Sequence, residues 1–200
     1  ATAHKFPWAM TLGAIQDKNL IAEMAAKIAE DCKRMGINWD FAPVVDVNTN
    51  PNNPIIGNRS FGSEVTNVVI SALAYSNGLQ DHNILAAIKH FPGHGDTNTD
   101  SHLDLPVVSH DLKRLNEIEL APFKTLMDKG IGGVMVAHLY VPALEKEKGI
   151  PASISKNIIT GLLKEKFGYK GLIITDALNM GAVAKRYKPG ELDALAFKAG

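Results

Sequence analysis

Four short apolar runs alternate with four segments of helical periodicity, and this alternation restricts the fold more than any other feature of the chain. The apolar runs span residues 37–47, 84–89, 131–138 and 171–176. They are almost continuously apolar, which is typical of parallel strands that are covered on both faces. A regular succession of helix and strand predicts an α/β fold with a parallel sheet. An open doubly wound sheet and a (β/α)8 barrel both fit this pattern.

The helical segments have recognisable ends and an apolar face. In the first segment, which begins near Ile21, that face carries Met24, Ala25, Ile28, Cys32 and Met35. Serine is favoured just before the first turn of a helix and glycine just after the last one. These signals predict a first helix that ends at Gly36, a second over about 64–80, a third that begins at Ser109 and restarts at Pro122, and a fourth that begins at Ser155 and ends at Gly168.

The composition is that of a globular protein, with 46% hydrophobic and 21% charged residues. Because 21 basic residues balance 21 acidic ones, there is no electrostatic case for nucleic acid or an anionic membrane as a partner. No apolar run approaches the roughly 18 residues that span a bilayer. The single cysteine, Cys32, excludes an internal disulfide and a cysteine-built zinc site, and it leaves the compartment open. No linker interrupts the chain, so we interpret it as one domain.

Ionisable residues gather where the predicted strands end. Asp46 follows the first strand, Lys89 and His90 the second, His138 the third, and Asp176 ends the fourth. In parallel α/β proteins the active site is built at the carboxyl ends of the strands. No strand is followed by a GxGxxG or GxxxxGK[ST] turn, which argues against a nucleotide site. The pattern therefore predicts an enzyme that acts on a different kind of substrate.

Asp176 has two interpretations. It can cap a helix that starts near Ala177, which is the ordinary role of an isolated aspartate at this place. It can also be a catalytic carboxylate that attacks an electrophilic carbon. Because the other three strands also end in polar groups, we favour the catalytic interpretation.

Arg59, Lys89 and His90 would supply fixed hydrogen-bond donors near this edge. Such donors suit a substrate with many hydroxyl groups. The alternative is structural, since buried cations need partners and each of these residues can pair with Asp46 or Asp104.

The segment KHFPGHGDTNTDSH, residues 89–102, contains a second candidate for proton transfer. Asp100 and His102 lie two apart, so an extended chain places both side chains on the same side. The carboxylate can then orient the imidazole and raise its basicity. The alternative is a surface loop in which Asp100 only caps a turn.

The same segment also offers ligands for a metal ion. His90, His94, Asp96 and His102 would supply nitrogen and oxygen atoms suited to zinc. However, the spacing is not that of an HExxH motif, and a segment rich in glycine and proline does not by itself orient ligands. We therefore expect no metal and no cofactor, and keep a metal-dependent hydrolase as the rival hypothesis.

The motifs GNRSFG, KHFPGHGDTNTDSH, MVAH and IITDALNMGAV together resemble the glycoside hydrolase family 3 catalytic barrel, and more narrowly the β-N-acetylglucosaminidases of peptidoglycan recycling. The resemblance runs along nearly the whole chain. It implies that Asp176 is the nucleophile of a retaining mechanism and that His102, oriented by Asp100, is the general acid/base. It also implies that Arg59, Lys89 and His90 bind the hydroxyls of the sugar, while His138 has no chemical role.

The family barrel has eight strands, and the motifs here match the third to the sixth. The resemblance therefore implies a (β/α)8 TIM barrel of which residues 1–200 cover about four βα units, without its N-terminal strands and C-terminal end. We expect such a part to be unstable or inactive alone. The implied substrate is a small N-acetylglucosaminyl saccharide. A family 3 phosphorylase, a β-glucosidase-type hydrolase and a sugar-binding barrel without catalysis remain alternatives.

Overall fold

The computed structural model describes residues 4–98, 105–188 and 190–200. Its centre is a four-stranded sheet in the order β1-β2-β3-β4, and every pair of neighbours is parallel. The strands are β1 (Trp39–Asp40), β2 (Leu85–Phe91), β3 (Gly133–Val136) and β4 (Leu172–Thr175). A doubly wound sheet reverses its strand order at a switch point, whereas here each strand pairs with the next one along the chain. The order is that of part of a (β/α)8 barrel.

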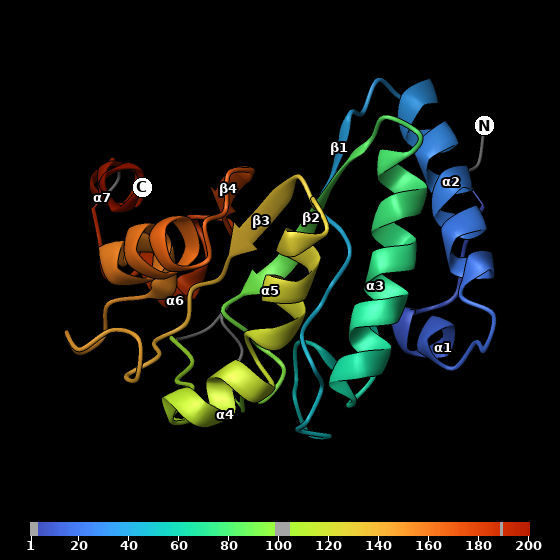
Figure 1. Ribbon diagram of the computed structural model, residues 1–200. Coiled ribbons are helices and arrows are strands. Elements are labelled where there is room, and N and C mark those ends of the chain that lie inside the picture. Colours follow the sequence, from blue (N-terminus) through green and yellow to red (C-terminus); the bar gives the residue numbers. More distant parts are fainter. Residues whose placement is uncertain (1–3, 99–104, 189) are drawn as a thin grey trace.

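The helices between the strands cover the sheet, and Figure 1 shows α3 and α5 next to β2 and β3. Consecutive parallel strands joined by right-handed crossovers place their helices on the same face. The longer helices are α2 (Asn19–Arg34), α3 (Val65–Gln80), α5 (Ala121–Asp128), η3 (Asn157–Lys166), which is wound as a π-helix, and α7 (Glu191–Ala199). The shorter ones are α1 (Ala9–Gly13), η1 (Gly57–Arg59), α4 (Leu112–Glu117), η2 (Ala152–Ile154) and α6 (Gly181–Ala184). Within the described ranges, no helix is both long and apolar enough to cross a membrane.

The main hydrophobic core lies between the sheet and these helices. From the strands it takes Ala86, Ile88, Val134 and Val136, all of which are fully buried. Phe91 at the end of β2 packs edge to face against Phe123 of α5, with ring centroids 5.2 Å apart. This core fixes the strand ends, and the loops after β1 and β2 lie at the same end of the sheet as α4 (Figure 1).

Three details of the elements differ from the sequence prediction. The first strand is regular only at Trp39–Asp40, because Pro43 has no N–H to donate, although Val45 N–H still bonds to the carbonyl of Lys89 at 2.7 Å. Asp111, not Ser109, caps α4 by accepting a bond from the backbone N–H of Arg114 at 2.8 Å. Met35 is 74% exposed, because α2 ends one residue earlier.

Candidate active site

Asp46 follows β1 and is the hub of a buried network at the ends of β1 and β2. Its side chain has no exposed surface. Oδ2 accepts bonds from the backbone N–H and the ring Nδ1 of His90, at 3.1 and 2.7 Å. Oδ1 accepts the backbone N–H of His94 at 2.7 Å. One carboxylate therefore joins the loop after β1 to the end of β2 and to the turn that follows it.

The bonds around His90 define its protonation. Nε2 of His90 lies 3.2 Å from Nη2 of Arg59. A guanidinium can only donate, so Nε2 is the acceptor and the proton is on Nδ1, which donates to Asp46. His90 is therefore a neutral imidazole that orients Arg59, and both of its ring nitrogens are engaged. Arg59 also donates to the carbonyl of Ile55 at 3.2 Å, so its guanidinium is held at two places.

The charges in this network follow from burial and from its partners. Burial alone would raise the pKa of Asp46, but the interactions with His90 and His94 hold it below its ordinary value. Burial lowers the pKa of His94 to about 4, so this imidazole is neutral near pH 7. Its Nδ1 lies 2.7 Å from Oγ1 of Thr97. Asp46 is thus the charged member of a hub whose imidazoles are neutral.

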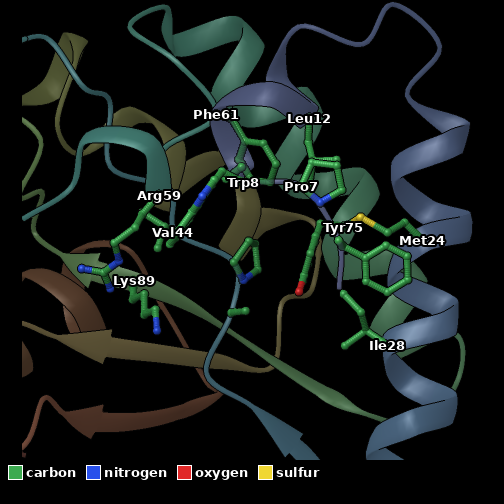
Figure 2. A pocket seen from close by; sticks show the side chains of 14 residues that line it. Pro7, Trp8, Leu12, Met24, Ile28, Val44, Arg59, Phe61, Tyr75 and Lys89 are labelled. Carbon is green, nitrogen blue, oxygen red and sulfur yellow. The ribbon is translucent and has the colours of Figure 1, made fainter. Parts of the chain in front are cut away.

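Lys89 and Arg59 lie at one end of a pocket of about 360 Å³ that is lined by the N-terminal segment, by α2 and by residues 42–44 after β1 (Figure 2). Aromatic and aliphatic side chains make up most of its wall, including Trp8, Phe61 and Tyr75. Burial and the nearby Arg59 lower the pKa of Lys89, whereas the carboxylates of Asp176, Asp40 and Asp46 raise it. Lys89 is therefore a partly desolvated cation within the field of the carboxylates at the strand ends.

Asp176 comes directly after β4 and is half-buried. Its backbone N–H donates to the carbonyl of Val136 at 2.8 Å, which continues the sheet pairing to this residue. Its Oδ1 accepts the backbone N–H of Ala177 at 2.7 Å. The carboxylate at the end of this strand is therefore restrained, and part of it remains accessible.

His138 fixes the backbone next to Asp176. Its Nε2 lies 3.1 Å from the carbonyl of Ala177 and its Nδ1 lies 2.7 Å from Oγ of Ser153. Because a carbonyl only accepts, Nε2 carries the proton and Nδ1 accepts from the serine hydroxyl. Burial lowers the pKa of His138, so the ring stays neutral near pH 7. Its two bonds restrain the backbone at Ala177, next to Asp176.

The structure brings together Arg59 and His90, which share a hydrogen bond, and it places Lys89 where it interacts with Arg59 and Asp176. Asp100 and His102 lie outside the described residues. The position of Asp46 after a strand indicated only in part that it joins several segments. No sequence pattern indicated Asn53, which is buried beneath the same turn and whose Nδ2 donates to the carbonyl of His94 at 2.8 Å.

Of the four metal ligands suggested by the sequence, the structure describes His90, His94 and Asp96, and these three do not form one group of possible ligands. His90 uses both ring nitrogens on Asp46 and Arg59, and Asp96 is paired with His110 instead. Among the described residues, the three side chains that come close enough to share an ion are Asp96, His110 and Glu119. The guanidinium of Arg114 already lies 3.2 Å from Glu119.

The comparison with known families agrees with the strand order and the placement of these residues. The whole chain, residues 1–200, matches the model of the glycosyl hydrolase family 3 N terminal domain. The chain belongs to glycosyl hydrolase family 3. Its fold is therefore that of the family's barrel domain, of which the structure has four parallel strands.

Relatives within the family are similar along nearly the entire chain. Beta-hexosaminidase A of Pseudoalteromonas piscicida is 38% identical over 211 residues, which cover 99% of this chain and 35% of that protein. A family 3 β-N-acetylglucosaminidase from Paenibacillus sp. str. FPU-7 is 45% identical, with a TM-score of 0.93 over 96% of this chain and 36% of its own. The β-glucoside phosphorylase BglX is 27% identical, with a TM-score of 0.95 over 100% of this chain and 38% of its own. The chain thus spans little more than a third of the length of each of these proteins.

Proposed function

We propose that the protein is a retaining exo-β-N-acetylglucosaminidase that releases terminal N-acetylglucosamine from peptidoglycan-derived saccharides. The single observation that carries this proposal is the seat of Asp176. Its carboxylate is restrained at the end of β4 but remains partly accessible, and it interacts electrostatically with Lys89. The similarity to a β-hexosaminidase and to a β-N-acetylglucosaminidase supports the sugar that we assign.

In the proposed reaction, an oxygen of Asp176 attacks the anomeric carbon and the glycosidic C–O bond breaks. His102, oriented by Asp100, gives its proton to the leaving oxygen as that bond breaks. Water then attacks the same carbon, His102 takes up the proton of the water, and the carboxylate of Asp176 is released. A histidine in this role departs from the common scheme with two carboxylates, because an Asp/His pair supplies the proton of the general acid.

Arg59 and Lys89 are the sugar-binding cations in this proposal. Arg59 is held by His90 and by the carbonyl of Ile55, so a fixed set of its N–H groups is directed toward one place. Lys89 is half-buried, and its ammonium donates in up to three directions. His90 has both ring nitrogens engaged in this geometry, so it contributes to sugar binding by orienting Arg59 unless the bond between them opens when the sugar binds.

The covalent intermediate provides the decisive test. A 2-fluoro-sugar with a good leaving group slows both chemical steps, so that the glycosyl-enzyme accumulates in the intact protein. Mass spectrometry of the peptides should find the label on Asp176. A label on any other residue contradicts the nucleophile assignment, and a variant of the exposed Asp193 serves as a control that should still be labelled at Asp176.

A glycoside phosphorylase is the second candidate, because BglX is also similar over the full length of the chain. A neutral or cationic histidine tolerates an incoming phosphate better than a carboxylate does. Product analysis in phosphate buffer separates the two activities. Hydrolysis yields free N-acetylglucosamine, whereas phosphorolysis yields the 1-phosphate in proportion to the phosphate concentration.

Two simpler measurements test the hypotheses of other classes. The proposed glycosidase should keep its full activity in a metal chelator, whereas a metal-dependent hydrolase should lose it. A sugar-binding protein without catalysis should bind the saccharide and leave it intact.

A further inference from the structure

A second polar cluster lies beside the candidate active site and has no part in the proposed chemistry. It consists of Asp96, His110, Arg114 and Glu119, and we call it the Arg114 cluster. Nε2 of His110 lies 2.5 Å from Oδ2 of Asp96. Nη2 of Arg114 lies 3.2 Å from Oε1 of Glu119 and 3.8 Å from Oδ2 of Asp96. The same Nη2 donates to Oγ1 of Thr49 at 3.4 Å.

Glu119 is the buried member of the cluster, whereas the side chains of Arg114, His110 and Asp96 are 36%, 31% and 24% exposed. Glu119 is 5% exposed, and burial raises its pKa while Arg114 lowers it. Two buried atoms, Nε of Arg114 and Oε2 of Glu119, have no hydrogen-bond partner among the described residues. The side chain of Arg114 is 36% exposed, and an ion pair with a partly exposed partner contributes little to stability on its own. A role in geometry fits the arrangement better.

The cluster connects three segments at the end of the sheet. Thr49 belongs to the loop after β1 and Asp96 to the turn after β2, while Arg114 lies in α4. Through a single nitrogen, Arg114 links α4 to the other two segments and also contacts Glu119, which follows α4. A lysine keeps the charge, but its ammonium stands on a different stem from the guanidinium and does not reproduce the position of Nη2.

The turn after β2 is held from both sides. A Cβ atom at Gly93 would lie 2.7 Å from Cβ of Glu119, so the backbone and this side chain are in close contact. A Cβ at Gly95 would lie 1.9 Å from the carbonyl oxygen of Val47 on the opposite side. Between these two glycines, the N–H of His94 is bonded to Asp46, the residue that also holds His90. The Arg114 cluster therefore supports the same turn that the Asp46 network holds from the other side.

We propose that Arg114 is a positioning residue of the active site, which holds the turn after β2 through Glu119 and Asp96. In the sequence, Asp96 and His110 also flank the residues Asp100 and His102, to which we assign proton transfer. Arg114 thus positions both the sugar-binding network and the start of the segment with the acid/base pair. This inference rests on the proposed function.

Kinetics of two variants of the intact protein, Arg114→Met and Arg114→Lys, test the proposal. A displacement of about 1 Å at a catalytic group can cost about 10²-fold in rate, so we expect kcat/KM for an aryl N-acetylglucosaminide to fall by about that factor in Arg114→Met. Arg114→Lys should recover only part of this loss. The loss should be greater for substrates with poor leaving groups, because these depend on the acid/base pair.

The measurements are made well below the Tm of each variant, so that a purely structural role leaves kcat/KM unchanged in the folded protein. Arg34→Met is the matched control, since Arg34 also pairs with a carboxylate, at 3.3 Å, but its side chain is 73% exposed. If Arg114→Met does not fold, Glu119→Gln keeps the shape and removes the charge, and it should show the same losses. Variants that stay within twofold of the wild type for all leaving groups overturn the proposal.

Hydrogen–deuterium exchange separates this inference from the proposed function. Peptides that cover residues 90–98 should exchange at least about tenfold faster in Arg114→Lys than in the wild type, because the turn is no longer fixed on the Glu119 side. Unchanged exchange overturns the positioning role whether or not the protein is a hydrolase. A wild-type protein that does not release N-acetylglucosamine refutes the proposed function and leaves the exchange result to decide this inference.

Discussion

Replacing Asp46 by asparagine tests the buried network most directly, because the two side chains have almost the same shape. The carboxylate accepts three hydrogen bonds, two from His90 and one from His94. An asparagine has one oxygen and one NH2 group. If the oxygen faces His94, the NH2 group meets the two donors of His90. If the oxygen faces His90, the NH2 group meets the N–H of His94. At least one buried donor loses its acceptor in either orientation.

The size of the effect follows from burial. A buried donor without a partner costs about 1–3 kcal/mol, and the cost is greater where the lost acceptor is charged. We therefore expect Asp46→Asn to lower the free energy of unfolding by about 3 kcal/mol. If the amide turns its NH2 group toward His90, the imidazole moves its proton to Nε2 and can no longer accept from Arg59. The guanidinium is then released, and kcat/KM should fall by about 10²-fold.

Urea unfolding and hydrolysis of an aryl N-acetylglucosaminide measure the two effects in the intact protein. Asp31→Asn is the matched control, because Asp31 pairs with the exposed Arg34, and such surface pairs contribute about 0–1 kcal/mol. A stability within 0.5 kcal/mol of the wild type together with an unchanged kcat/KM would refute the role of Asp46 as a hub, where 0.5 kcal/mol is about the usual effect of a surface substitution.

The same network predicts a pH dependence. The pKa of Asp46 is lower in the folded protein than in the unfolded chain. Its stabilising contribution is therefore present above the unfolded pKa of about 3.9 and is lost as the pH falls toward the folded pKa. The difference in unfolding free energy between the wild type and Asp46→Asn should shrink below about pH 4. A difference that stays constant or grows with acidity contradicts this.

Three further predictions concern single residues. Gly95→Ala should destabilise the protein by about 3 kcal/mol or more, because its Cβ would lie 1.9 Å from the carbonyl oxygen of Val47. In the control Gly161→Ala the nearest atom to the new Cβ lies at 3.9 Å, so thermal unfolding should show a neutral or slightly stabilising effect. Burial lowers the pKa of His94 to about 4. Between about pH 6.5 and 4, His94 is therefore protonated in the unfolded chain but neutral in the folded protein. As the pH falls over that range, the free energy of unfolding should decrease by up to about 3 kcal/mol, and urea titrations should show a smaller decrease in His94→Gln. Equal decreases in the two proteins would contradict this role of His94. Asp176→Ala should reduce kcat by roughly three or more orders of magnitude, and near-normal turnover would exclude it as the nucleophile.

Periodicity predicted the four strands and the longer helices before and between them, but not α7 after β4. The helix predicted over about 64–80 is Val65–Gln80, and the run 84–89 overlaps Leu85–Phe91. Both succeed because the pattern of buried residues is local, with a period set by the backbone. The choice between a barrel and a doubly wound sheet needed the order of the strands, which is a property of the fold as a whole.

The helix cap at α4 shows where local rules stop. Ser109 and Asp111 are both good N-cap residues, and the sequence does not rank them. In the structure His110, which lies between them, pairs with Asp96 in the turn after β2, and the helix begins after Asp111. A contact between residues 14 apart in the sequence is involved in the choice.

The sequence by itself determined which residues stand at the ends of the strands, because the length of each apolar run locates its own end. His138 and Asp176 lie just beyond the ends of β3 and β4, as the sequence predicted, whereas Lys89 and His90 lie within β2, which continues to Phe91. Only the tertiary structure decided what these residues bind. The proton of His90 is on Nδ1 because Asp46, 44 residues away, accepts it and Arg59, 31 residues away, donates to the other nitrogen. Hydrogen bonds between distant residues depend on how the strands are packed, and no local pattern records them.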